Sequence, residues 1–196
     1  MLRTGRDTFC FLILNLLLAF VPYIISYCLT NRAAGRPGLW RRLTLAAGCL
    51  AWLLCIPNAF YITTDLFHLT DWYNDHKIPT WYDLVMILSF AWNGFFLGVL
   101  SVRQMERLLR PHLPAHNELL FLYPLFWLNA LGVYIGRYLR YNSWDVIADP
   151  FRLFRDIASI LMHPLRNDYA WGMIFCFSIL MTLMYLMLRK ISRALA

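Results

Sequence analysis

Polar side chains gather at the end of the second long apolar stretch of the chain. Asn58, Tyr61, Asp65 and His68 follow one another at intervals of three or four residues. On a continuous α-helix, with 3.6 residues per turn, this spacing places the four side chains within roughly 80° of one another. The spacing therefore predicts a polar stripe along one side of a helix at a membrane boundary.

A carboxylate three residues before an imidazole can do chemistry in two ways. Asp65 and His68 could form an acid–base pair or bind a divalent metal ion, with Asp83 as a third ligand or as an orienting group. The alternative is structural, in which the same side chains form ion pairs and hydrogen bonds that hold helices together. For Asp65 and His68 by themselves, the residue types favour this structural alternative.

Two arginines lie at the end of the fourth apolar stretch, where they suit an anion. A guanidinium group beside a membrane surface can bind two oxygens of a phosphate or carboxylate at once. The alternative is that these arginines anchor the chain to lipid headgroups or pair with aspartates. The predicted catalytic residues are Asp65, His68 and Asp83, and the predicted substrate-binding residues are Arg137, Arg140, Asn142, Asp145, Asn58 and Tyr61.

The composition indicates a membrane protein. Of the 196 residues, 60% are hydrophobic and 15% are charged, whereas about 25% of the residues in a soluble domain are charged. Several apolar stretches reach about 20 residues, which is enough to cross a hydrocarbon core of about 30 Å. The net charge of +7 comes from basic residues that flank these stretches, so nucleic-acid binding is not expected.

The apolar stretches predict an all-α, polytopic membrane helix bundle in a single domain over residues 1–196. Five transmembrane spans are expected, at about 9–29, 43–62, 81–102, 119–139 and 169–188. Pro57 should bend or break the second span near its end. An alternative therefore has six membrane segments, with residues 57–80 forming a re-entrant or spanning hairpin. Asn15 lies inside the first span and should bond to a neighbouring helix.

An amphipathic helix is predicted before the last span, over about 150–162. Asp149 is a good N-cap, and Pro150 suits the first helical position. Such a helix would lie in the membrane interface, because its apolar and polar side chains separate. The apolar face holds Phe151, Phe154, Ile157, Ala158 and Leu161, and the polar face holds Arg152, Arg155, Asp156 and Ser159.

Five spans would bring the candidate site residues to one membrane face. The end of the second span, the start of the third and the end of the fourth all lie on the same side of the bilayer. Charged groups at membrane depth are costly and are usually paired or functional. We therefore expect the aspartates, the histidine and the two arginines to converge there.

Three segments also carry a resemblance to a known family. They are PNAFYITTDLFH at 57–68, WYD at 81–83 and GRYLRYNSWD at 136–145. From the first span to the last, the chain resembles the bacterial integral-membrane family called domain of unknown function 1361. The resemblance implies a small multi-pass protein of a bacterial inner membrane, and it implies no particular activity.

Two functions fit these observations. The leading one is a polar site at one membrane face that binds or processes an anionic amphiphile, such as a lipid phosphate. The alternative is a non-enzymatic accessory or transport subunit, whose polar residues form a structural network or a polar path. The residues leave open whether the protein is an enzyme. The expected partners are the lipid bilayer and an anionic lipid, and the cofactor in view is a divalent metal ion.

Overall fold

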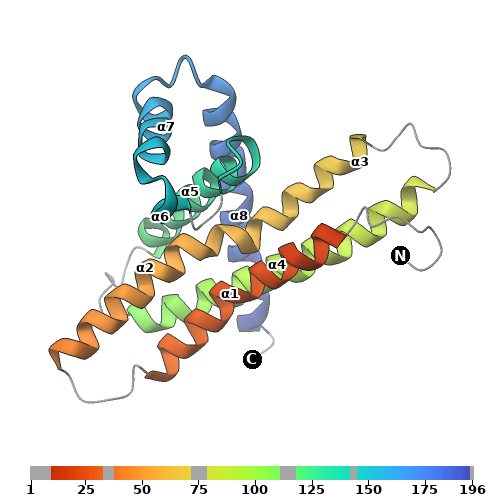
Figure 1. Ribbon diagram of the computed structural model, residues 1–196. Coiled ribbons are helices and arrows are strands. Elements are labelled where there is room, and N and C mark those ends of the chain that lie inside the picture. Colours follow the sequence, from red (N-terminus) through yellow and green to blue (C-terminus); the bar gives the residue numbers. More distant parts are fainter. Residues whose placement is uncertain (1–9, 33–37, 72–78, 111–117, 142–144, 195–196) are drawn as a thin grey trace. The chain divides into compact units, whose positions relative to one another are not determined.

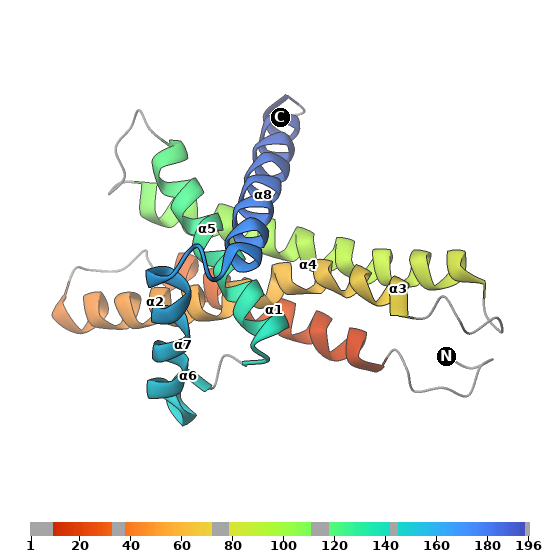
Figure 2. The ribbon, with the colours of Figure 1, turned by 90° about the horizontal axis from the view of Figure 1, so that it is seen from above.

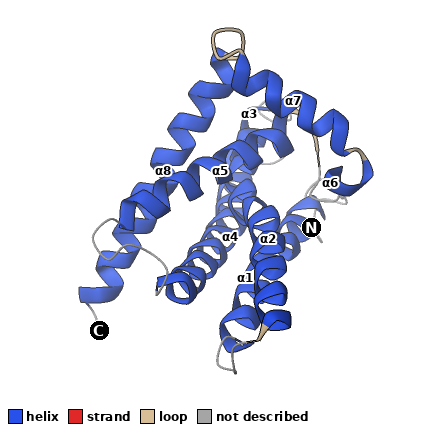
Figure 3. Ribbon diagram, turned by 90° about the vertical axis from the view of Figure 1, so that its left-hand side faces the viewer, coloured by secondary structure: helices blue, strands red, loops and turns tan. Residues whose placement is uncertain are grey.

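The computed structural model describes residues 10–32, 38–71, 79–110, 118–141 and 145–194. Within these ranges every secondary-structure element is a helix (Figure 3), which confirms the all-α prediction. The chain divides into two compact units, residues 1–111 and 112–196, and each is described by itself. A single membrane domain over the whole chain stays a prediction.

Three long helices build the first unit. They are α1 (Cys10–Arg32), α2 (Leu39–Tyr61) and α4 (Thr80–Leu109), and they pack side by side (Figures 1 and 2). The end of α2 passes directly into a 3-10 helix, η2 (Ile62–Phe67), and then into the short α3 (His68–Asp71). These three elements follow one line (Figure 1), so the described part of residues 57–80 forms no hairpin.

The second unit holds the remaining helices. They are α5 (Glu118–Tyr138), α6 (Asp145–Ala148), α7 (Pro150–Met162) and α8 (Asp168–Ala194). The rings of Phe126 on α5 and Tyr185 on α8 pack with their centroids 5.5 Å apart. The predicted bounds of the amphipathic helix are confirmed by α7, which begins as expected: Asp149 accepts a hydrogen bond from the Arg152 amide, at 3.3 Å.

Among the residues that the structure describes, four segments are helical, long and apolar enough to cross a membrane. They are Phe11–Asn31, Leu39–Phe67, Thr80–Leu109 and Asp168–Ala194, and they match the first, second, third and fifth predicted spans. These segments support the predicted membrane protein. The predicted fourth span coincides with α5, a helix of 21 residues that is not among the four.

Two glycines let α4 approach the end of α2 closely. A Cβ atom added at Gly98 would lie 2.9 Å from Cζ of Phe60, and one added at Gly94 would clash with Cγ2 of Ile62. Gly94 and Gly98 have the small-x-x-x-small spacing that brings membrane helices together. Their contacts place Ile62 opposite Gly94 and so help to set the register of α4 against α2 and η2.

Buried polar side chains also join the three helices. The indole of Trp52 on α2 donates to Oγ of Ser101 on α4, at 2.7 Å. The Ser101 hydroxyl also lies 3.0 Å from the hydroxyl of Ser26 on α1, which donates to Oε1 of Gln104 at 2.6 Å. Ser26 and Ser101 are thus level with each other, and this contact sets the register of α1 against α4.

The close approach at Gly94 gives a first prediction. Gly94→Ala should lower the free energy of unfolding by about 1–3 kcal/mol, because the added methyl group overpacks the contact with the buried Ile62. Chemical denaturation of the purified protein in detergent measures the change. Gly172→Ala on α8 is the matched control, since nothing lies within 4 Å of the added atom. It should be neutral or stabilise by up to about 1 kcal/mol. Equal losses in both variants would contradict the packing argument.

Candidate functional site

Asp65 is a buried acidic residue of the first unit. It lies on η2 and is 0% exposed. Nδ2 of Asn15 on α1 donates to Oδ2 of Asp65 at 2.7 Å. The expectation that Asn15 bonds to a neighbouring helix is therefore confirmed. Such a donor matters because a carboxylate taken out of water loses several kcal/mol of solvation that hydrogen bonds must replace.

His68 faces the same helix as Asp65. Its ring packs edge-on against Phe11 of α1, with the centroids 5.2 Å apart and the planes at 61°. Phe11 and Asn15 are four residues apart and so lie on one face of α1. This face offers an aromatic ring to the imidazole and an amide to the carboxylate. The structure thus brings two predicted catalytic residues, Asp65 and His68, against one neighbouring helix.

The switch to a 3-10 helix changes the predicted polar stripe. The spacing of Asn58, Tyr61, Asp65 and His68 predicts one stripe on a continuous α-helix, but from Ile62 the chain has three residues per turn. Asp65 is turned inward and fully buried, while the other three side chains are half-buried. The carboxylate therefore lies inside the helix bundle, and the stripe does not continue as a surface feature.

The helix registers show how deep Asp65 lies. α1 and α4 run in the same direction (Figure 1), with Ser26 level with Ser101. Asn15 precedes Ser26 by eleven residues, so it is level with about residue 90 of α4, roughly 15 Å beyond the start of that helix at Thr80. Asp65 lies at the depth of Asn15, which is level with the inside of α4 but only two residues from the end of the candidate span Leu39–Phe67 that holds Asp65. A charged group at that depth is usually paired or functional.

Asp83 lies at a different depth from Asp65. It is in the first turn of α4, about seven residues before the level of Asn15, which is roughly 10 Å along the helix. Its Oδ1 atom is shielded from solvent and has no hydrogen-bond partner among the described residues. The role of Asp83 as a third ligand or orienting group stays a prediction.

The metal hypothesis has two candidate ligands, Asp65 and His68. In the part of the chain that the structure describes, no three His, Cys, Asp or Glu side chains come together as a metal site. A stable protein-bound metal ion generally takes three or more protein ligands. Metal binding by Asp65 and His68 therefore also stays a prediction.

The predicted anion-binding arginines lie at the end of α5 in the second unit. Arg137 is in the last turn and is half-buried, and Arg140 follows the helix and is exposed. Beside them, the hydroxyls of Tyr138 and Tyr169 share a hydrogen bond of 2.7 Å. This bond ties the end of α5 to the start of α8, next to Arg137.

Tyr141 joins the same region to α7. Its hydroxyl donates to Oδ2 of Asp156 at 2.9 Å, and the guanidinium carbon of Arg152 lies 6.0 Å from the centroid of its ring. Desolvation, followed by the hydrogen bond to Asp156, raises the pKa of Tyr141 above its usual value. Like an unperturbed tyrosine, the phenol keeps its proton at neutral pH and remains a donor. The spacing of residues did not point to these tyrosines, because their partners are distant in sequence.

Arg140 has a strained backbone. Its φ is +58°, in the left-handed region that glycine adopts freely and that costs other residues about 1–2 kcal/mol. The strain occurs where α5 ends, and the Tyr141 amide donates back to the Ile135 carbonyl at 3.3 Å. Strained non-glycine residues cluster at functional sites. The strain therefore supports Arg140 as a candidate site residue.

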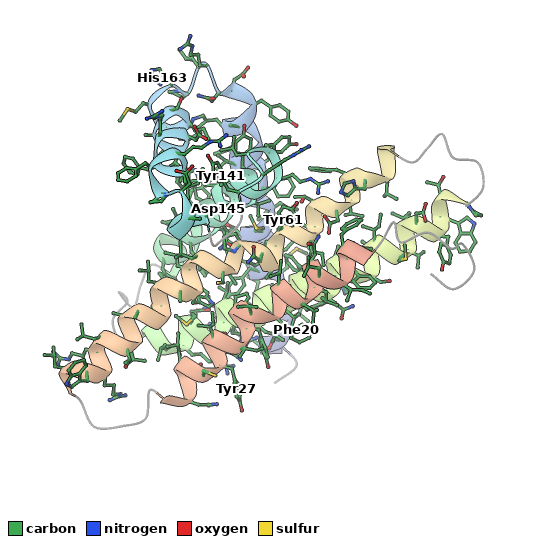
Figure 4. All side chains as sticks on the ribbon, viewed as in Figure 1. Phe20, Tyr27, Tyr61, Tyr141, Asp145 and His163 are labelled. Carbon is green, nitrogen blue, oxygen red and sulfur yellow. The ribbon has the colours of Figure 1, made fainter. Side chains whose placement is uncertain are left out.

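The other predicted site residues of the second unit have different outcomes. Asn142 lies outside the described residues, and Asp145 begins α6 and is half-buried. Figure 4 labels Tyr141 and Asp145, which directly precede and follow residues 142–144 in the sequence. The predicted site residues thus fall in both units, and their convergence stays a prediction.

Several buried polar residues were missed by the sequence reasoning, and Asn129 is the amide among them. Asn129 on α5 is 1% exposed and donates to the Leu125 carbonyl of its own helix at 3.3 Å. Its Oδ1 atom has no hydrogen-bond partner among the described residues. A lone amide inside an apolar stretch, the signal that singled out Asn15, could have found it.

A family model matches residues 14–184, from within α1 to within α8, and its description is protein of unknown function (DUF1361). The chain belongs to this family. The predicted resemblance is thereby confirmed over most of the chain. No curated protein and no solved structure matches the chain. Together with the four helices long enough to cross a membrane, the match supports a membrane protein of unassigned activity.

The Asn15–Asp65 bond predicts an energetic coupling between two helices. Asn15→Leu and Asp65→Leu should each destabilise the protein, and their effects should be non-additive by about 0.6–2 kcal/mol, the range of hydrogen bonds between membrane helices and to charged groups. A double-mutant cycle by denaturation in detergent measures this coupling. Asn93→Leu is the control for Asn15→Leu, because Asn93 is exposed on α4 and donates only to the Ser89 carbonyl of its own helix. Additive effects of Asn15→Leu and Asp65→Leu would show that the bond adds no stability.

The backbone of Arg140 gives a third prediction. Arg140→Gly and Arg140→Ala both remove the charge, but only glycine relieves the left-handed strain. The glycine variant should be about 1 kcal/mol more stable than the alanine variant, measured as the difference in denaturation midpoints. Equal stability of the two variants would mean that the strain is absent in solution.

Proposed function

We propose that the protein binds an anionic amphiphile, such as a lipid phosphate, at one face of a bacterial inner membrane. Arg137 and Arg140 hold the anion. The observation that carries the proposal is the strained Arg140, which follows a helix end where Arg137 and the paired hydroxyls of Tyr138 and Tyr169 also lie. The family match agrees with a membrane protein and names no activity of its own.

The chemistry of this region suits a phosphate or carboxylate group. A guanidinium donates to two oxygens in a planar fork, which a lysine ammonium cannot do. Arg137 is half-buried, so its interactions are screened less by solvent than those of an exposed arginine. Tyrosine hydroxyls next to it add neutral donors that bind oxygen without requiring a further charge.

In the enzymatic version of the proposal, Asp65 and His68 supply acid–base chemistry. Asp65 is fully buried, where a carboxylate is costly, and His68 lies one turn further along the same segment. Asp83, Asn58, Tyr61, Asn142 and Asp145 remain candidate members of the site. Binding of the anion by the arginines does not require this chemistry, so an accessory protein that only binds lipid is included.

The alternative is a structural or transport role for the polar residues of the first unit. The hydrogen bond of 2.7 Å between Asn15 and Asp65 favours it, because this bond joins two helices. Asp65→Asn separates the two roles, since the amide oxygen can still accept from Asn15. If the Asp65→Asn variant keeps its stability but loses the cellular function, the carboxylate has a chemical role. If the variant keeps both its stability and its function, the side chain has a structural role, which the amide oxygen can fill.

Arg137→Lys tests anion binding directly. The variant keeps the charge but loses the fork, so co-purifying anionic lipid should fall about tenfold, which corresponds to roughly 1.4 kcal/mol, while the melting temperature stays unchanged. Mass spectrometry of lipids bound to the purified protein measures the loss. Arg107→Lys is the control, because Arg107 is exposed in the last turn of α4 and lies in neither of the proposed lipid contacts. Equal lipid content in the parent chain and both variants would rule out a binding role for the guanidinium of Arg137.

A further inference from the structure

Apolar side chains cover a continuous arc of roughly 200° around α7, and only part of this arc is buried. At roughly 100° per residue, Leu153 and Ile160 lie together on the side opposite Phe151. Ile160 is 4% exposed and packs inside the second unit. Phe151, Phe154 and Met162 lie within roughly 80° of one another and are 85%, 74% and 75% exposed. Only one side of this apolar arc is therefore buried in the second unit, and the side with Phe151, Phe154 and Met162 is exposed.

Hydrogen bonds hold α7 in a defined orientation within this unit. Asp156 accepts from the hydroxyl of Tyr141, which follows α5, at 2.9 Å. The indole of Trp171 on α8 donates to the Ile160 carbonyl at 3.0 Å, and Nδ2 of Asn167 donates to the Ser159 carbonyl at 3.2 Å. These contacts lie on the polar and buried sides of α7, so they leave the exposed apolar face free to meet something else.

The chain connection places that face at a membrane boundary. α8 is one of the four helices long and apolar enough to cross a membrane, and it begins at Asp168, shortly after α7 ends at Met162. The short turn between them, from which His163 projects (Figure 4), is closed by the Asn167 amide donating to the His163 carbonyl at 3.2 Å. Because a spanning helix starts near the bilayer surface, a helix tied to that start is held at the surface as well.

The residues that border the face fit lipid headgroups. Arg155 lies roughly 40° and Arg152 roughly 100° around the helix from Phe151, and both are exposed. Arginines beside an apolar face reach toward phosphates while their stems stay in the apolar layer. At the end of the helix, Leu165 in the turn is 96% exposed, and it extends the apolar surface toward α8.

We propose that the exposed face of α7 inserts into the boundary between headgroups and acyl chains, at the point where α8 enters the bilayer. The occupant of the face is lipid, contacted by Phe151, Phe154, Leu161 and Met162. This surface is separate from the anion-binding role of Arg137 and Arg140, so the failure of one leaves the other standing. It gives α7 the role of a membrane-surface anchor that supports the end of α5 through Tyr141.

Site-specific photocrosslinking tests the proposal. The photoreactive residue p-benzoylphenylalanine is placed at Phe154 in the full chain, which is reconstituted in vesicles of phosphatidylcholine and phosphatidylglycerol and irradiated. Phe154 is 74% exposed, so the probe replaces one exposed ring by another. Mass spectrometry should find phospholipid adducts at this position. The same probe at Ser159, on the polar side of α7, is the control and should give about tenfold fewer.

Other crosslinks would overturn the proposal. Adducts from Phe154 to residues of the first unit would show that the face packs inside the protein, and adducts to a second copy of the chain would show an oligomer interface. A lack of lipid adducts at Phe154 would also overturn it, because the probe reacts with any C–H group within reach. A probe at Met162, on the same face, gives an independent reading should the Phe154 variant fail to fold.

Discussion

The hydrogen bond between Asn15 and Asp65 is the constraint on which the first unit depends. A carboxylate that is 0% exposed loses its solvation and must find donors inside the protein. The donor comes from α1, so α1 has to lie against η2 in one register. The contact between Phe11 and His68 and the level of Ser26 with Ser101 agree with that register. One polar pair therefore limits how three apolar helices can slide past one another.

The same unit separates its polar groups into two layers. The Asn15–Asp65 layer and the layer of Ser26, Trp52 and Ser101 are about eleven residues apart on α1, or roughly 16 Å. Between them, Gly94 and Gly98 bring α4 against Ile62 and Phe60 through apolar contacts. In lipid, apolar packing distinguishes registers poorly, because tails and side chains are equally apolar. The hydrogen bonds of the two polar layers therefore select one register of the helices. The glycines allow the helices to come close enough for these hydrogen bonds to form.

The second unit shows a different use of polar groups. Its bonds lie at helix ends: Tyr138 with Tyr169, Tyr141 with Asp156, and Trp171 with the Ile160 carbonyl. They fix α7 between the end of α5 and the start of α8, with the strained Arg140 at the point where the chain leaves α5. This arrangement keeps arginine and hydroxyl donors at a helix end, where charged groups can meet water or a headgroup at lower cost than in a span.

The sequence by itself determined the class of the protein and the position of most helices. Runs of about 20 apolar residues permit little other than membrane helices, because backbone groups in lipid must bond within their own segment. The cap of Asp149 and the bounds of α7 were also readable, since they depend on neighbours in sequence. The GxxxG spacing of Gly94 and Gly98 was present as a signal as well. Only the tertiary structure decided that Asp65 turns inward to Asn15, that Asp83 lies at another depth, and which side of the apolar arc of α7 is buried. These outcomes depend on a 3-10 turn and on partners up to fifty residues away, and periodicity along one segment carries no information about either.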